Sequence, residues 1–230
     1  MRGMFQLHRR APGLSAYRIL FWWTFMIWVM RTLLRIFYRY RSSGKELIPK
    51  TGPIIFIANH QSNFDPPIVG VESTDRPFKG IARITLFKSK ILTAYISGFG
   101  YIPIKRGESD TSAIRKALEE LAVGRCVMLF PEGTRSTDGE MGTFQRGFWL
   151  LLKKSKATVV PIGIDGAFDI FPIGGKPKLR GYIESKVGEP IAADVLLAMG
   201  EEAGTAHARL RVESLMLQCR SNIAARSTKA

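Results

Sequence analysis

A histidine and a carboxylate that lie five residues apart, His60 and Asp65, have the types and spacing needed for acid–base chemistry. They belong to a polar segment, residues 59–66 (NHQSNFDP), which follows a short apolar run. If this segment turns back on itself, the carboxylate can hold one ring nitrogen protonated and leave the other free as a base. The alternative is an aspartate that caps a helix beside an incidental surface histidine.

A second polar segment, residues 130–136 (FPEGTRS), combines groups that suit an anionic ligand. Pro131 turns the chain after another apolar run, and Gly133 lets the backbone approach a ligand closely. The hydroxyl groups and the Arg135 guanidinium then converge as a phosphate or a carboxylate requires. The alternative is an ordinary turn with a solvated arginine.

Two looser segments complete the pattern, residues 98–106 (GFGYIPIKR) and residues 160–166 (VPIGIDG). With all four in this order, the chain resembles the glycerolipid acyltransferase family, specifically the 1-acylglycerol-3-phosphate acyltransferases. That family is marked by an NHxSxxD box, an FPEGTRS box, a Gly…Ile-x-Arg segment and a VPI box. The resemblance covers residues 59–166.

The sequence departs from the family pattern at one place between the first two boxes. Family members usually carry Ala-Lys-Lys-Glu-Leu, whereas residues 82–86 of this chain read ARITL. Arg83 keeps a positive charge for a phosphate, but the second lysine and the glutamate are absent. The preference for an acceptor headgroup therefore stays open.

The resemblance implies transfer of an acyl group from acyl-carrier protein or acyl-CoA to the sn-2 hydroxyl of lysophosphatidic acid. The product would be phosphatidic acid, in phospholipid biosynthesis. His60 would take the proton of the hydroxyl, and Asp65 would orient the imidazole and stabilise its charged form. We expect no covalent intermediate, no metal and no cofactor besides the acyl donor, which is a substrate.

The same resemblance implies that arginines and the second box hold the oxyanion and the acceptor. Backbone N–H groups would hold the oxyanion, arginines would hold the acceptor phosphate, and a glutamate would fix the loop or the glycerol hydroxyls. The residues expected in these roles are Gly133 and Thr134 for the oxyanion, Arg83, Arg106 and Arg135 for the phosphate, and Glu132 for the loop or glycerol.

Three other functions remain open at this stage. An acyltransferase for another lyso-lipid, such as a lyso-aminolipid, is the nearest alternative. A hydrolase could use His60 and Asp65 to activate water. A membrane-binding module without enzymatic activity would explain the basic N-terminal segment but not the polar loops that follow.

The elements that must position these loops alternate between strand and helix. Such alternation predicts an α/β fold with a central, largely parallel sheet flanked by helices on both faces. Apolar runs predict strands, and amphipathic runs with capping residues predict helices. The expected strands are 54–58, 78–82, 101–104, 126–130, 158–164 and 179–187. One expected helix begins at residue 66, and four others cover 86–96, 109–123, 144–154 and 201–225.

The net charge of the 230-residue chain is +15, from 34 Lys and Arg against 19 Asp and Glu. Such a surplus favours a polyanionic partner. Residues 1–50 hold ten basic residues against one acidic residue, together with Trp22, Trp23 and Trp28. No RNP, zinc-finger or helix-turn-helix pattern is present, and the aromatic residues form one apolar block, so we expect no nucleic-acid partner.

The apolar run at residues 19–30 is too short to cross a bilayer by itself. Twelve helical residues cover about 18 Å, against a hydrocarbon core of about 30 Å. A longer span would place Arg31 and Arg35 in the membrane, at about 2.5–3.5 kcal/mol each. A signal peptide, a spanning anchor, a buried core helix and helices lying in the interface all remain open, and the last is favoured.

These observations predict two regions and a location. Residues 1–45 would form N-terminal helices on an anionic membrane surface, and residues 46–230 would form the acyltransferase domain. The expected location is the cytoplasmic face of the inner (plasma) membrane. The hydrophobic fraction of 46% excludes an intrinsically disordered chain. We expect Cys126 to be a core residue and the basic residues of the last helix, including Arg209 and Arg220, to form a solvated face.

Overall fold

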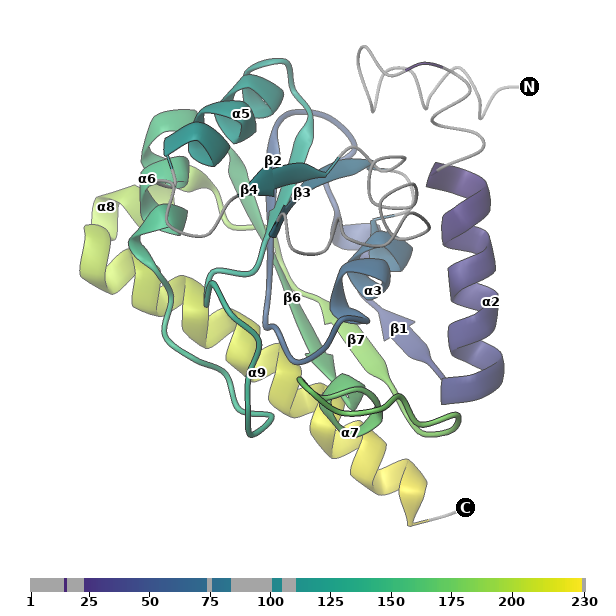
Figure 1. Cartoon of the computed structure of the whole chain (residues 1–230). Coiled ribbons are helices and arrows are strands. Elements are labelled where there is room, and N and C mark those ends of the chain that lie inside the picture. The colour runs from purple at the N-terminus through teal and green to yellow at the C-terminus, as the bar shows by residue number, and fades with distance from the viewer. Residues whose placement is uncertain (1–14, 16–22, 74–75, 84–100, 105–110, 229–230) are drawn as a thin grey trace.

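The structure is a computed structural model that describes residues 15, 23–73, 76–83, 101–104 and 111–228. Within these residues, one sheet has the strand order β1-β7-β6-β2-β5-β3-β4 (Figure 1). All neighbouring strands are parallel except β6 and β7. The strands are β1 Arg41–Ser43, β2 Ile54–Ala58, β3 Phe78–Arg83, β4 Ile102–Ile104, β5 Cys126–Leu129, β6 Thr158–Asp165 and β7 Glu184–Val187. The expected α/β fold with a largely parallel sheet is confirmed.

Helices cover both faces of the sheet, as two separate clusters of buried side chains show. One face carries α2 Met26–Tyr38, α3 Asp65–Glu72 and the short α7 Ala167–Ile170. The other face carries α5 Thr111–Ala122, α6 Arg146–Ser155, α8 Ala193–Met199 and the long α9 Glu201–Ser227. A 3-10 turn, η2 Lys45–Leu47, follows β1.

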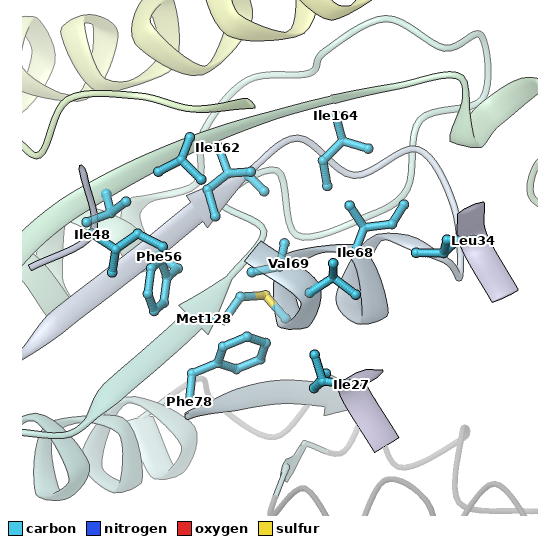
Figure 2. Close-up of a cluster of buried hydrophobic side chains, with 14 of the residues drawn as sticks. Ile27, Leu34, Ile48, Phe56, Ile68, Val69, Phe78, Met128, Ile162 and Ile164 are labelled. Carbon is cyan, nitrogen blue, oxygen red and sulfur yellow. The ribbon is translucent and has the colours of Figure 1, made fainter. Parts of the chain in front are cut away.

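Strand β2 lies at the centre of the sheet and joins the two apolar clusters. Ile54 and Phe56 point to the α2 and α3 side, whereas Ile55 and Ile57 point to the α5 and α9 side. All four side chains are fully buried. A strand that is covered on both faces reads as a continuous apolar run, which explains why sequence patterning locates β2 so well. Figure 2 shows Phe56 within the first of these clusters.

Helix α9 packs directly on strand β6 at a glycine. A Cβ atom at Gly163 would lie 2.3 Å from the backbone nitrogen of Met216, so any larger side chain would push the helix away. This close approach also brings α9 to the loop that follows β5. This loop contains the second polar segment, residues 130–136.

The expected strand at residues 179–187 is wrong in its first half. Strand β7 begins at Glu184, and the residues before it form a loop in which the N–H of Lys178 donates to the carbonyl of Ile170 at 2.9 Å. Gly181 lies within the expected strand, where a glycine weakens strand pairing. The expected helix at 86–96 lies outside the described residues, and β1, α7 and α8 are elements that the pattern did not predict.

Helix α2 has apolar side chains on two sides. Ile27 and Leu34 are buried against the core beside α3 (Figure 2). Its other side exposes large apolar residues, namely Phe25 just before the helix and Trp28, Leu33, Ile36 and Phe37 within it. Among the described residues, no helix has the length and hydropathy needed to cross a bilayer. Whether residues 1–45 associate with a membrane stays a prediction.

Candidate active site

The polar loops leave the same edge of the sheet because the strands that carry them are parallel neighbours. Strand β2 lies between β5 and β6, and Ile57 of β2 is paired with Leu129 of β5. The chain after β2 reaches His60, and the chain after β5 reaches Glu132. The carboxyl ends of parallel strands are the usual place for ligand binding in α/β sheets.

His60 and Asp65 are in direct contact, as their spacing predicts. The His60 Nδ1 atom lies 2.8 Å from Asp65 Oδ2. The same oxygen accepts the backbone N–H groups of Gln61 and Ser62, each at 2.6 Å. The Asp65 side chain is fully buried, whereas the His60 side chain is 19% exposed. Asp65 is the first residue of α3, where the helix dipole favours a negative charge.

The His60 ring is held on its face as well as at its edge. The Phe130 ring stacks on it with 3.9 Å between centroids and 11° between planes. Asp65 occupies the Nδ1 side, and none of the described residues forms a hydrogen bond with Nε2. A histidine held in this way can present Nε2 to a substrate in one orientation.

Glu132 links the two polar loops through backbone N–H groups. Its Oε1 atom accepts the N–H of His60 and its Oε2 atom accepts the N–H of Gly142, both at 2.7 Å. Burial raises the pKa of the Glu132 carboxyl, and the two N–H donors partly oppose this shift. Because both oxygens are used inside the protein, this geometry fits loop fixation, one of the two roles expected for Glu132.

The two residues expected to donate to the oxyanion, Gly133 and Thr134, differ in whether their N–H groups are available. Gly133 has a φ of +70°, in the left-handed region that favours glycine. Its N–H donates to the carbonyl of Phe130 at 3.0 Å and so closes the turn. No described residue accepts the N–H of Thr134, which is exposed. Of the two expected donors, Thr134 therefore has the available N–H.

Only one of the three arginines expected to bind phosphate can be placed. Arg135 is half-buried, and its guanidinium makes no hydrogen bond or ion pair with the described part of the chain. Arg83 ends strand β3, but its side chain lies outside the described residues, as does the whole of Arg106. Arg135 is thus a cation beside the His60 loop that no described carboxylate neutralises.

Two arginines of α9 donate hydrogen bonds to the loop that follows β5, although we expected them to form a solvated face. Arg209 donates to the carbonyls of Met141 and Gly142 at 3.1 and 3.0 Å. Arg220 donates to the carbonyl of Gly139 at 3.1 Å. The two arginines are eleven residues apart, about three helical turns, and this spacing on one face was the available signal.

Asn59, the first residue of the first box, has a structural position. Its side-chain amide donates to the carbonyl of Ile164 and accepts the N–H of the same residue, both at 2.8 Å. The pair ties the end of β2 to β6. Cys126 is fully buried in β5, as expected, and burial raises the pKa of its thiol to about 11.

Comparison with known proteins gives a consistent result. A family model described as Acyltransferase matches residues 39–165. The chloroplastic 1-acyl-sn-glycerol-3-phosphate acyltransferase LPAT1 of Arabidopsis thaliana is 34% identical over 167 residues, 70% of this chain and 46% of that protein. The enzyme of the same name from Pseudomonas aeruginosa is 29% identical over 193 residues, 80% of this chain and 71% of that protein. The chain spans slightly less than half of the chloroplastic relative.

A solved structure shows the same fold. The crystal structure of the 1-acyl-sn-glycerophosphate (LPA) acyltransferase PlsC from Thermotoga maritima superposes with a TM-score of 0.73. The match covers 95% of this chain and 88% of that chain at 24% identity. It extends beyond the residues matched by the family model.

Proposed function

Because the chain belongs to the acyltransferase family, we propose that it transfers an acyl chain from a thioester to the sn-2 hydroxyl of lysophosphatidic acid. The donor would be acyl-CoA or acyl-carrier protein, and the product would be phosphatidic acid. The observation that carries this proposal is the His60–Asp65 contact, which leaves the His60 Nε2 atom directed away from its buried partner.

The proposed reaction needs one proton acceptor and no covalent enzyme intermediate. His60 Nε2 takes the proton of the acceptor hydroxyl while the hydroxyl oxygen attacks the thioester carbonyl carbon. The tetrahedral intermediate then breaks its C–S bond, and the imidazolium returns the proton to the leaving thiolate. Asp65 stabilises the imidazolium and fixes the ring so that Nδ1 carries its proton toward the carboxylate.

The second loop supplies the proposed binding groups. The N–H of Thr134 is a donor for the oxyanion that forms on the carbonyl oxygen. Arg135 binds the acceptor phosphate through charge-assisted hydrogen bonds, and Arg83 and Arg106 complete the proposed phosphate site. Glu132 holds this loop against the backbone of His60 at 2.7 Å, so the donors and the base keep a fixed separation.

The proposed acceptor and product are membrane lipids, so the active site must face a bilayer. Phosphatidic acid has two acyl chains and does not leave the membrane. The exposed apolar residues of α2, such as Trp28 and Ile36, together with the basic surplus of residues 1–50, would place the protein on an anionic surface. We propose the cytoplasmic face of the inner membrane as the location.

An acceptor panel with one labelled acyl-thioester tests the proposed acceptor. Lysophosphatidic acid, a lysophospholipid with a zwitterionic headgroup and a lyso-aminolipid would be compared as acceptors, with water alone as the fourth arm. We expect lysophosphatidic acid to give the highest kcat/KM because Arg135 recognises a phosphate monoester. Preference for the lyso-aminolipid would support the alternative acceptor, and equal acyl release without any acceptor would support a hydrolase.

A further inference from the structure

The loop between α7 and β7, residues 171–182, combines exposed apolar and basic side chains. Leu179 is 77% exposed and Ile173 is 43% exposed. The exposed cations Lys176, Lys178 and Arg180 lie between and beside them, and residues 171–182 contain no Asp or Glu. Single exposed apolar side chains are common on protein surfaces, but apolar and basic side chains together, without acidic ones, are typical of a segment that contacts an anionic membrane. We name residues 171–182 the α7–β7 loop.

The α7–β7 loop has a defined conformation. The N–H of Lys178 donates to the carbonyl of Ile170 at 2.9 Å, which closes the loop at its base. A turn within it joins the N–H of Gly175 to the carbonyl of Pro172 at 3.1 Å. Because these bonds shape the backbone, the exposure of Leu179 is a property of a formed loop.

Aromatic contacts place this loop beside the C-terminal end of α2, as Figure 1 also shows. The Phe171 ring lies 5.5 Å from the Phe64 ring, which lies 5.5 Å from the Tyr38 ring of α2. Arg39, just after α2, donates to the hydroxyl of Tyr182 and lies 5.0 Å from the centroid of its ring. The first and last residues of the α7–β7 loop therefore lie near the C-terminal end of α2, the helix that exposes the other large apolar side chains.

The base of the loop is bonded to the His60 loop. The Ser62 hydroxyl donates to the carbonyl of Phe171 at 2.8 Å. The N–H of the same serine donates to Asp65 Oδ2 at 2.6 Å. Ser62 thus links the α7–β7 loop directly to Asp65, the carboxylate that holds His60.

We propose that the α7–β7 loop is a second contact with an anionic lipid bilayer, separate from α2. Leu179 and Ile173 enter the interface, while Lys176, Lys178 and Arg180 contact lipid phosphates. Apolar side chains next to cations, without acidic residues, fit an anionic bilayer, which has negative headgroups over an apolar acyl-chain region. Contacts at both α2 and this loop would fix the rotation of the domain on the membrane, which one helix alone leaves free.

This proposal extends the membrane attachment of the proposed function, and its test measures lipid binding without any acyl transfer. A fluorescence experiment reports directly on Leu179. The native thiols of Cys126 and Cys219 are buried, and burial raises the pKa of both, so an environment-sensitive maleimide would label a Leu179→Cys variant selectively. Leu210→Cys is the matched control, because Leu210 is 57% exposed on α9.

The probe would be vesicles of phosphatidylcholine with and without phosphatidylglycerol. We expect the label of the Leu179→Cys variant to shift to shorter emission wavelengths when anionic vesicles are added, and the label of Leu210→Cys to shift little. Equal shifts in both variants, or no shift at Leu179→Cys while the protein co-sediments with the vesicles, would overturn the proposal.

Charge removal gives an independent measurement on the same surface. Replacing Lys176, Lys178 and Arg180 by serine should weaken binding to anionic vesicles about a hundredfold at low salt, since each basic residue near such a surface contributes about fivefold. The control replaces three exposed lysines of α5 and α6 by serine: Lys116, Lys153 and Lys154. The proposal is wrong if the loop variant binds anionic vesicles as tightly as the control variant does. It is also wrong if the loop variant loses affinity only for an acidic carrier protein.

Discussion

Helix α3 carries a buried carboxylate at each end, and the two ends are built in similar ways. Asp65 begins the helix and Glu72 ends it. Asp65 Oδ2 bonds to the His60 ring, and Glu72 Oε1 accepts the Tyr40 hydroxyl at 2.7 Å. In each carboxylate the other oxygen is buried and has no partner among the described residues. Burial and hydrogen bonding alone do not tell these two sites apart.

The difference lies in the partner of each carboxylate. The His60 side chain is 19% exposed and has a second nitrogen, whereas the Tyr40 residue is 5% exposed and Ser185, which donates to Glu72, is fully buried. Burial raises the pKa of Glu72 and raises that of Tyr40 well above its ordinary value. Because Tyr40, Glu72 and Ser185 are all buried, no group of this cluster is exposed to a substrate. A buried carboxylate is therefore a candidate for catalysis where its hydrogen-bond partner is itself exposed, as at Asp65 and not at Glu72.

The largest effect should come from replacing the exposed partner. We expect His60→Ala to lower kcat by about 10²- to 10⁴-fold, the usual contribution of a general base. Steady-state transfer assays on protein with an unchanged circular dichroism spectrum would measure it. Activity within about tenfold of the wild type, in a folded variant, would remove His60 from the role of base.

Replacing the buried partner at the same end should have a smaller effect. Asp65→Asn keeps an oxygen for the N–H groups of Gln61 and Ser62 and for the His60 Nδ1–H, but removes the charge that stabilises the imidazolium. We expect a loss of kcat that is smaller than that of His60→Ala, measured in the same assay. A larger loss from Asp65→Asn would reverse the two roles.

Replacing Arg135 should change acceptor binding more than chemistry. A guanidinium–phosphate contact contributes about 1.5–3 kcal/mol, so Arg135→Ala should raise the KM for lysophosphatidic acid about ten- to a hundredfold. The KM for the acyl donor should change little. An acceptor without a phosphate is the control. If that acceptor is affected equally, Arg135 does not bind the phosphate.

The smallest effect on activity should come from the closed end of α3. We expect Glu72→Gln to keep kcat within about twofold of the wild type, because Glu72 does not reach the substrate site. Its effect should instead be on stability. The folded pKa of Glu72 is raised, so its contribution to stability is present below the unfolded pKa and is lost as pH rises through the folded pKa.

Urea unfolding of both proteins across pH 4–8 would show this effect as a difference between two curves. The wild type should lose stability relative to Glu72→Gln as the pH rises, since only the wild type must ionise a buried carboxyl. Parallel curves would mean that Glu72 titrates alike in the folded and unfolded states. A large loss of kcat in Glu72→Gln would break the distinction between the two ends of α3.

The sequence predicted the parts of the site that depend on local order. Continuous apolar runs located β2 and β5, because both strands are buried on two faces. The polar segments that carry His60 and Glu132 follow directly after these strands, as the sequence order indicates. The contact between His60 and Asp65 needed only a turn across five residues, and the structure has it.

Contacts between distant segments could not be predicted in this way. Arg220 bonds to the carbonyl of Gly139, 81 residues away. The spacing of Arg209 and Arg220 indicates a shared helix face but not the segment that this face contacts. The engagement of the Gly133 N–H in a turn depends on the φ angle of that residue. The last part of the α7–β7 loop, residues 179–182, was expected to be strand, whereas β7 begins at Glu184.

The central claim, transfer of an acyl group to an acceptor hydroxyl, is tested most directly by following the acyl label. The purified full chain would be incubated with a thioester labelled in its acyl group, with and without lysophosphatidic acid. We predict that the label appears in phosphatidic acid only when the acceptor is present, and that none stays on the protein. Release of the label as free fatty acid at the same rate with and without the acceptor would contradict the account.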